Sequence, residues 1–366
     1  MAKKRQLAVL IPAYNEAVIL ERTLRAILEL ICPEDIYVID DGSSDKTAQV
    51  AAKYLPGSRI LVLSRNLGKA RATNLAIRKF KLARRYRFLM PMDADTIITA
   101  DFIPETLKVL EGDRQQKLAC VVGKVLGKNH SWITSYRLWE YEISQAVYKK
   151  AQEKIGSIIV CPGCATVYRA QIFARVRIPA ETITEDMDFT FEIHRRNLGR
   201  IAYAEKAQVV TQDPGNLTDF VKQADRWYTG FWQCVAKHQI PWGGQRLDLE
   251  VALLASEGLL NSFLVLFLLF VGPWILLKNP ALLVVPFLAD LFLFLIPTLF
   301  YTAWKNGTWK IFYFIPQFYL IRALSSLLYL KSFLKVVLGG DFLMRWHKAV
   351  RYQEKEAKIW PSPSSA

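Results

Sequence analysis

The first part of the chain alternates short apolar runs with stretches that have helical spacing. Residues 7–11 read Leu-Ala-Val-Leu-Ile, a continuous apolar run typical of a strand that is buried on both faces. Comparable runs follow at 36–39, 60–63 and 88–92, and segments with apolar residues at every third or fourth position separate them. Strands that alternate with helices predict an α/β fold with a parallel, doubly wound sheet.

Beyond residue 95 the alternation is less regular. We expect helices at 101–111 and 185–197, a long amphipathic stretch at 132–151, and strands at 119–125, 166–168, 200–203 and 208–211. The helical pattern at 217–237 mixes aromatic with basic residues, so we expect this helix to lie at a membrane interface.

Two later runs have the length of membrane spans. Residues 251–277 and 281–304 each hold about the 20 apolar residues that a helix needs to cross hydrocarbon, and only Glu257 and Asp290 interrupt them deeply. A third run, at 311–330, contains Arg322 and would place the basic tail outside if it crossed the membrane. Its charges favour an interfacial or re-entrant helix and its length permits a span, so we expect two or three transmembrane helices.

Composition supports a division into a soluble part and a membrane part. Of the 366 residues 52% are hydrophobic, and the excess lies after residue 240. We therefore expect an α/β domain at 1–215, an interfacial helix at 216–245, a transmembrane module at 246–335 and a basic tail at 336–366.

The start of the chain and its charge indicate where these parts lie. The sequence Met-Ala-Lys-Lys-Arg leads into a strand and not into the apolar segment of a secretory signal peptide. We therefore expect a multi-pass protein of the cell membrane with its α/β domain in the cytoplasm. The net charge of +15 suits either nucleic acid or an anionic membrane surface. Because the basic residues of the tail suit contact with the cytoplasmic leaflet, we expect no nucleic-acid partner.

Acidic residues follow two of the predicted strands. Asp93 and Asp95 come after the strand at 88–92 and offer hard oxygen ligands suited to Mg²⁺ or Mn²⁺, although the same pattern is common in turns and helix caps. Asp40 and Asp41 end the second strand, where a carboxylate can accept hydrogen bonds from a nucleobase or a ribose. A plain strand-to-helix turn explains this second motif equally well.

Two further motifs lie on predicted helices. Glu185 and Asp186 begin a helix, where a carboxylate is either a cap favoured by the helix dipole or a general base for a hydroxyl group. Gln223, Arg226 and Trp227 share one helical face at spacings of three and four. There Arg226 can pair with phosphate oxygens and Trp227 can stack on a sugar ring. An interfacial aromatic belt with a snorkelling arginine is the alternative.

Six motifs occur in order along the chain. They are Pro-Ala-Tyr-Asn-Glu at 12–16, Asp-Asp-Gly-Ser-Ser-Asp at 40–45, Asn-Leu-Gly-Lys-Ala at 66–70, Asp-Ala-Asp at 93–95, Thr-Glu-Asp at 184–186 and Gln-Ala-Asp-Arg-Trp at 223–227. Their order and spacing resemble the membrane-bound family-2 glycosyltransferases, which include the synthases of cellulose, chitin, hyaluronan and poly-N-acetylglucosamine. The resemblance covers roughly residues 6–240. It extends weakly to the tail, where Trp346 and Arg351 resemble a Trp-x-x-Thr-x-Arg element and Ala349 stands in the place of the Thr.

The resemblance implies a GT-A (Rossmann-like) fold, Mg²⁺ or Mn²⁺ as cofactor, and inverting transfer of a sugar from a nucleoside diphosphate sugar, first of all a UDP-sugar. It also implies a role for each matching residue. Tyr14, Glu16, Asp40, Asp41 and Lys69 lie around the nucleotide; Asp93 contacts the diphosphate and, with Asp95, the metal; Asp186, next to Glu185, is the catalytic base; Gln223 and Arg226 hold the diphosphate; Trp227, Gly163 and Cys164 line the acceptor site.

The acceptor remains open between a growing polysaccharide, our first choice, and a lipid that receives one sugar, as in ceramide glucosyltransferases. Ala224 stands where processive members usually have Gln or Arg, and the N-terminal spans of polymer synthases are not seen. Two or three spans are few for a channel within one protomer, so a homo-oligomer or an accessory subunit is a further candidate partner beside donor, acceptor and membrane. A non-catalytic membrane subunit is the weaker alternative, since every motif keeps its carboxylates.

Overall fold

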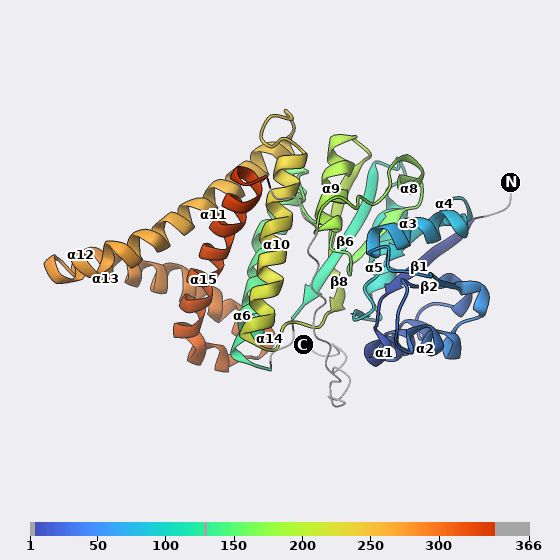
Figure 1. Ribbon diagram of the computed structural model, residues 1–366, viewed down its shortest axis with the longest axis horizontal. Coiled ribbons are helices and arrows are strands. Elements are labelled where there is room, and N and C mark those ends of the chain that lie inside the picture. The colour runs from blue at the N-terminus through green and yellow to red at the C-terminus, as the bar shows by residue number, and fades with distance from the viewer. Residues whose placement is uncertain (1–3, 128–129, 341–366) are drawn as a thin grey trace.

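The computed structural model describes residues 4–127 and 130–340 of the 366-residue chain. Within them an N-terminal α/β domain is followed by long helices that extend away from it (Figure 1). The predicted basic tail from residue 341 onward, including Trp346, Ala349 and Arg351, lies outside the described residues.

The α/β domain is built on one eight-stranded mixed sheet in the order β3-β2-β1-β4-β7-β6-β8-β5. Strands β1 to β4 are mutually parallel where they pair, as predicted, whereas β7 is antiparallel to both β4 and β6 and β5 is antiparallel to β8. The strands are β1 Arg5–Ala13, β2 Ile36–Asp40, β3 Ile60–Val62, β4 Tyr86–Pro91, β5 Ile97–Ile98, β6 Leu118–Leu126, β7 Thr166–Arg169 and β8 Arg200–Val210.

Helices cover both faces of this sheet, which explains the continuous apolar run of β1. Val9 and Ile11 lie in one buried cluster with residues of α1 and α2, while Ala8 and Leu10 lie in a second cluster with residues of α3. The helices of the domain are α1 Ala17–Leu28, α2 Thr47–Tyr54, α3 Lys69–Lys79, α4 Leu82–Arg85, α5 Phe102–Gly112, α6 Trp132–Ile143, α7 Lys150–Ile155, α8 Ile172–Arg175 and α9 Glu185–Arg195.

The prediction of two strands at 200–203 and 208–211 is wrong, because both belong to β8. Strand β6 pairs with β8 on either side of an irregularity, at Gly123 with Ala204 and at Lys124 with Gln208. Residues 205–207 lie between these pairs and form a bulge. Two of them are the polar Glu205 and Lys206, which interrupt the apolar pattern of the strand in the sequence. A side chain at Gly123 would place its Cβ 2.6 Å from the carbonyl oxygen of Ala207.

Three helical segments in the described residues are long and apolar enough to cross a membrane by length and composition. They are Arg246–Phe270, Ala281–Asn306 and Trp309–Leu338, and they comprise α11 Arg246–Phe270, α13 Ala281–Ala289, α14 Ile296–Asn306 and α15 Ile315–Phe333, with α12 Gly272–Lys278 between the first two. We call them the apolar module. The third segment, which the charges disfavoured as a span, meets the same criteria as the other two.

An ion pair explains how this third segment accommodates its arginine. The guanidinium of Arg322 donates to both carboxylate oxygens of Asp290, at 2.7 and 3.0 Å, and Tyr319 donates to the same carboxylate at 2.6 Å. Paired charges of this kind are the usual form in which ionisable residues occur between apolar helices. The charges of Arg322, on α15, and Asp290, in the segment that contains α14, therefore compensate each other.

The apolar module packs on the domain through α6 and through α10 Leu217–Lys237, which has the bounds predicted for the interfacial helix. Trp139 of α6 donates a hydrogen bond to Thr298 of α14 at 3.0 Å. A buried ion pair adds to this contact: the ammonium of Lys124 lies 2.7 and 2.8 Å from the two carboxylate oxygens of Glu142, and Lys305 of α14 approaches the same carboxylate at 3.3 Å.

Replacement of Glu142 should therefore destabilise the protein strongly. Glu142→Gln leaves the buried ammonium of Lys124 without its countercharge, which typically costs about 3–5 kcal/mol of unfolding free energy. Thermal unfolding of the purified protein in detergent measures this. Glu111→Gln is the matched control, because Glu111 is 39% exposed in its pair with Arg87 and an exposed pair contributes at most about 1 kcal/mol. Equal shifts in the two variants would contradict the structural role of the buried pair.

Candidate active site

The turn after β2 is held against the loop that precedes α3. The backbone amides of Leu67 and Gly68 donate to the two carboxylate oxygens of Asp41, both at 2.8 Å. Gly42 has φ +76°, and a Cβ there would lie 2.5 Å from the backbone of Arg65. Burial raises the pKa of Asp41 although these amides oppose the shift. The predicted nucleotide motif is thus a rigid connection between two loops at the carboxyl ends of parallel strands.

The loop after β1, which carries Tyr14 and Glu16, is attached to the same turn. The amide of Asn15 donates to Ser43 at 2.9 Å, and the amide of Glu16 donates to Thr47 at 2.8 Å. Asp40 accepts a hydrogen bond from the amide of Ser43 at 2.8 Å. Four residues predicted around the nucleotide, Tyr14, Glu16, Asp40 and Asp41, therefore lie in connected loops at one edge of the sheet.

Lys69 joins two of the acidic motifs. Its ammonium lies 2.6 Å from Asp93, which follows β4, and 2.8 Å from Glu185 at the start of α9. Burial alone would lower the pKa of this lysine, but the charges of Asp93, Glu185 and Asp186 outweigh burial and hold the pKa well above its usual value. The start of a helix disfavours a cation, so these carboxylates supply the compensation that Lys69 needs at the first position of α3.

Asp186 lies on the other side of this pair, beside the segment that leads to β7. Its carboxylate accepts a hydrogen bond from the amide of Met187 at 2.8 Å and faces the amide of Gly163 at 3.4 Å. Burial raises the pKa of Asp186, and the neighbouring charge of Glu185 adds to this. A carboxylate with a raised pKa is closer to the range in which a general base works.

Gly163 and Cys164 lie against the same cluster. A Cβ at Gly163 would come within 2.6 Å of the Lys69 ammonium and 3.8 Å of the Asp93 carboxylate, so any side chain there would displace the lysine. Burial raises the pKa of the Cys164 thiol, and the charges of Asp93 and Asp95 raise it further. The structure thus brings together Lys69, Asp93, Asp95, Glu185, Asp186, Gly163 and Cys164.

The donor set of Asp93 and Asp95 fits a hard divalent cation. Both residues are half-buried and follow the carboxyl end of β4, and carboxylate oxygens are the ligands that Mg²⁺ and Mn²⁺ prefer. A second group with ligand-type atoms is formed by Asp188, Glu192 and His238. There Lys237 lies 2.8 Å from Asp188 and Arg196 lies 2.6 Å from Glu192, so a cation would have to displace basic side chains there, as it would displace Lys69 from Asp93.

Helix α10 positions the loop that precedes Glu185 and Asp186. A Cβ at Gly230 would lie 2.4 Å from the side chain of Thr184, so the glycine allows the helix to approach this loop closely. The buried side chain of Gln233 accepts a hydrogen bond from the amide of Ile183 at 3.0 Å. Gly230 and Gln233 lie just beyond the last motif, and only a glycine inside a predicted helix could have drawn attention to them.

Gln223 and Trp227 of the last motif contact an arginine that the sequence did not single out. The guanidinium of Arg137, on α6, lies between the rings of Phe220 and Trp227, with its carbon 4.3 and 4.5 Å from their centres. It donates to Gln223 at 2.8 Å and pairs with Glu140. Arg226, in contrast, is half-exposed and has no ion-pair or hydrogen-bond partner among the described residues. Gln223 and Trp227 of the last motif are therefore organised around the buried guanidinium of Arg137. The hydrogen bonds described for them do not involve the carboxylates of Asp93 and Asp186.

Part of the chain is similar in sequence to known proteins. Residues 8–177 match the model of glycosyl transferase family 2. The poly-beta-1,6-N-acetyl-D-glucosamine synthases of Staphylococcus epidermidis and Staphylococcus aureus (strain COL) are 29% and 30% identical over 61% and 60% of this chain. The matched regions are 54% and 53% of those proteins, so the chain spans about half the length of the curated relatives it matches.

Among solved structures, the mannosyltransferase PcManGT from Pyrobaculum calidifontis, in complex with GDP-Man and Mn²⁺, is similar with a TM-score of 0.58 and 17% identity. The similarity covers 93% of this chain and 89% of that one, and it shows the fold. The predicted GT-A fold and the resemblance to family-2 glycosyltransferases are confirmed.

Arg137 and Arg226 should differ sharply when each is replaced. Arg137→Ala removes a buried side chain from between two rings and leaves a cavity, so we expect a loss of about 2–5 kcal/mol in unfolding free energy. Arg226→Ala, which lacks a described partner, should change stability by no more than about 0.5 kcal/mol. Thermal unfolding of the two variants side by side tests this. A small effect at Arg137 would mean that its stack with Trp227 contributes nothing to the fold.

Proposed function

We propose that this chain, which carries a glycosyl transferase family 2 domain at residues 8–177, transfers a sugar from a nucleoside diphosphate sugar to a growing polysaccharide at a membrane, with inversion at the anomeric carbon. The ion-paired contact of Lys69 with Asp93 and Glu185, beside Asp186, is the observation that carries the proposal. It unites three motifs that lie far apart in sequence, at the edge of the sheet where α/β proteins bind ligands. The relatives named as poly-N-acetylglucosamine synthases support the acceptor class.

Donor binding would use the loops on either side of Asp41. The base and ribose of the nucleotide would lie over the turn after β2 and against the loop of Tyr14 and Glu16. Lys69 would exchange its carboxylate partners for diphosphate oxygens. Arg226, which has no partner among the described residues, offers a planar guanidinium for the same diphosphate. A UDP-sugar is the first candidate for the donor.

Asp93 and Asp95 are the residues that would hold Mg²⁺ or Mn²⁺. When bound there, the cation supplies Lewis-acid neutralisation of the diphosphate, which then leaves without protonation. The chain therefore needs one base and no general acid, in contrast to the paired carboxylates of glycoside hydrolysis.

Asp186 is the group that we assign as this base. Its carboxylate takes the proton of the acceptor hydroxyl as that oxygen forms a bond to the anomeric carbon, while the bond from that carbon to the diphosphate breaks and the diphosphate keeps the electron pair. We assign the base to Asp186 because its carboxylate faces the amide of Gly163 at 3.4 Å, beside the proposed path of the acceptor, and because burial raises its pKa. Attack opposite the leaving group gives inversion.

The membrane assignment rests on the three apolar helical segments and on α10, which packs between them and the domain. We propose a cytoplasmic glycosyltransferase domain at 1–215, an interfacial helix at 216–245, a multi-pass module at 246–335 and a basic cytoplasmic tail. Trp227, Gly163 and Cys164 would line the path of the acceptor. A homo-oligomer or an accessory subunit could complete that path.

Transfer of a single sugar to a lipid is the second candidate, and Ala224 favours it. This residue is 2% exposed and packs in the core between α10, α6 and the apolar module. The Gln or Arg that processive enzymes usually have at this place would not fit there without rearrangement. The last motif thus departs from the processive pattern at a buried position.

Asp186→Asn should abolish transfer while donor binding persists. Loss of a general base typically slows a reaction by about 10²–10⁴-fold. Thermal shift with UDP and Mn²⁺ should give the same stabilisation in the variant as in the original protein. Because the base works deprotonated and burial raises its pKa, transfer by the original protein should rise with pH through that raised pKa. Retained turnover in the variant would remove Asp186 from this role.

The length of the product distinguishes the two acceptors. Membranes that contain the protein, incubated with a labelled donor and Mn²⁺, should produce a chain of many sugars that resists extraction with lipid solvents. A product that consists only of monoglycosylated lipid would show transfer without polymerisation and would select the second candidate.

A further inference from the structure

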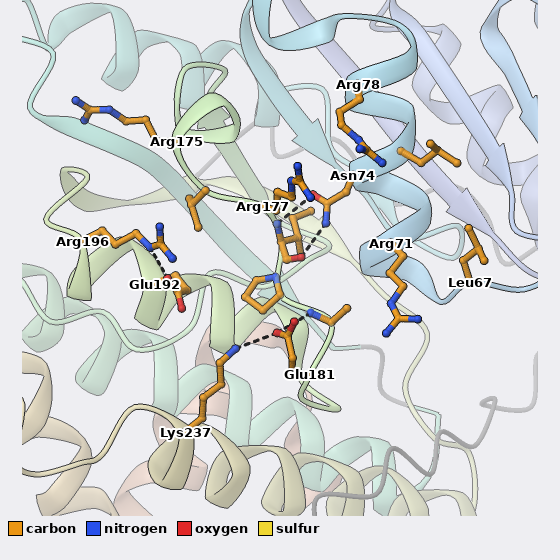
Figure 2. Close-up of a pocket in the computed structure, with 15 residues that line it drawn as sticks. Leu67, Arg71, Asn74, Arg78, Arg175, Arg177, Glu181, Glu192, Arg196 and Lys237 are labelled. Atoms are coloured by element: carbon orange, nitrogen blue, oxygen red, sulfur yellow. Dashed lines mark hydrogen bonds and ion pairs between the residues drawn. The ribbon is translucent and has the colours of Figure 1, made fainter.

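A large basic pocket lies outside the carboxylate cluster, between α3, the segment around α8, α9 and the end of α10 (Figure 2). Its volume is about 810 Å³, within the range of roughly 300–1,000 Å³ that small-molecule sites usually have. Six basic side chains line it: Arg71, Arg78, Arg175, Arg177, Arg196 and Lys237. Neither Lys69 nor Asp93 belongs to its lining, so the pocket is distinct from the proposed donor site.

Only two of these six cations are neutralised by the carboxylates of the pocket. Arg196 lies 2.6 Å from Glu192, and Lys237 lies 3.0 Å from Glu181. The other four, Arg71, Arg78, Arg175 and Arg177, are exposed, and none of them has an ion-pair or hydrogen-bond partner among the described residues. The lining therefore has an excess of four positive charges, which repel one another unless an anion is present.

The wall that carries these arginines is fixed in place. Arg71, Asn74 and Arg78 share one face of α3, because they are three and four residues apart. The amide group of Asn74 donates to the carbonyl of Ile178 at 2.8 Å and accepts from its backbone amide at 3.1 Å, so the segment with Arg175 and Arg177 is held against α3. Arg177 thus lies close to Asn74 on α3, whereas the side chain of Arg175 lies at the edge of the pocket and points away from the other arginines (Figure 2).

We propose that this pocket binds a phosphate-bearing ligand other than the sugar donor. A guanidinium group can donate two parallel hydrogen bonds to the oxygens of a phosphate. Four guanidinium groups carry more positive charge than the single carboxylate of a ligand could neutralise, which favours a ligand with phosphate groups. The volume suits a ligand of nucleotide size rather than an inorganic ion. The same chemistry is available from a soluble phosphorylated metabolite and from the headgroup of an anionic lipid.

The pocket also borders the loop that leads to Asp186. Glu181 begins this loop, and Lys237 connects it to Asp188 of α9 at 2.8 Å. Leu67, which lines the pocket, donates its backbone amide to Asp41. A ligand in the pocket would therefore contact elements that support both halves of the proposed active site.

The test is direct binding of inorganic triphosphate to the full chain in detergent without divalent metal, measured by calorimetry. The original protein should bind it, and Arg175→Gln combined with Arg177→Gln should weaken binding by at least about tenfold, because charge-assisted hydrogen bonds are lost. The control combines Arg84→Gln with Arg114→Gln, which removes the same charge from exposed residues outside the pocket and should change binding by less than about twofold.

Equal weakening in the control, unchanged binding in the pocket variant, or no binding by the original protein would each overturn the proposal. Arg71→Gln with Arg78→Gln tests the opposite wall, so the proposal stays falsifiable if the first variant folds poorly. To identify the source of the phosphate, triphosphate binding is measured again in nanodiscs of phosphatidylcholine with and without phosphatidate. If triphosphate binding is lost in the nanodiscs that contain phosphatidate, and the same variants affect it, the pocket binds a lipid headgroup. If triphosphate binds equally in both kinds of nanodisc, the natural ligand is soluble.

Discussion

The ammonium of Lys69 is the contact on which the candidate active site depends. It joins the end of β4, through Asp93, to the start of α9, through Glu185, at ion-pair distance. Without it, three carboxylates would face one another in a half-buried space, and their mutual repulsion would push these elements apart. The lysine can stay at the first position of α3 because these carboxylates compensate the unfavourable helix dipole. The same cation can pair with a diphosphate, so the contact that stabilises the free protein is one that a donor can replace.

A second constraint runs through α10, which contacts both the α9 loop and the apolar module. Gly230 and Gln233 hold the loop before Glu185 by close packing and one buried hydrogen bond. Earlier in the same helix, the rings of Phe220 and Trp227 enclose the guanidinium of Arg137. Any shift of the apolar helices that moves α10 would therefore move the loop of Asp186 as well. Helix α10 thus connects the loop before the proposed base to the apolar module.

Charge is compensated differently in the three parts of the molecule. The carboxylate cluster contains its own cation, Lys69, and the apolar module pairs Arg322 with Asp290. The basic pocket has no such balance within the described residues, since four of its arginines lack a countercharge. Proteins tolerate exposed like charges in water, but a preformed surface that collects them is the usual form of an anion site. This contrast separates the pocket from the rest of the basic surface.

Local sequence determined the first half of the fold and most of the candidate site. The apolar runs placed β1 to β4, and Asp41, Asp93 and Asp186 were candidates because each follows a strand or begins a helix, although only the order of six motifs distinguished them from ordinary turns and caps. The spacing of apolar residues and the residue types that form turns depend only on neighbouring residues, so both can be read from the sequence. Tertiary structure decided the rest: the single bulged β8, the burial of Arg137 between two rings, and the pocket whose arginines come from α3 and the segment around α8. These features depend on which distant residues pack together, and no local pattern records the partner of a side chain.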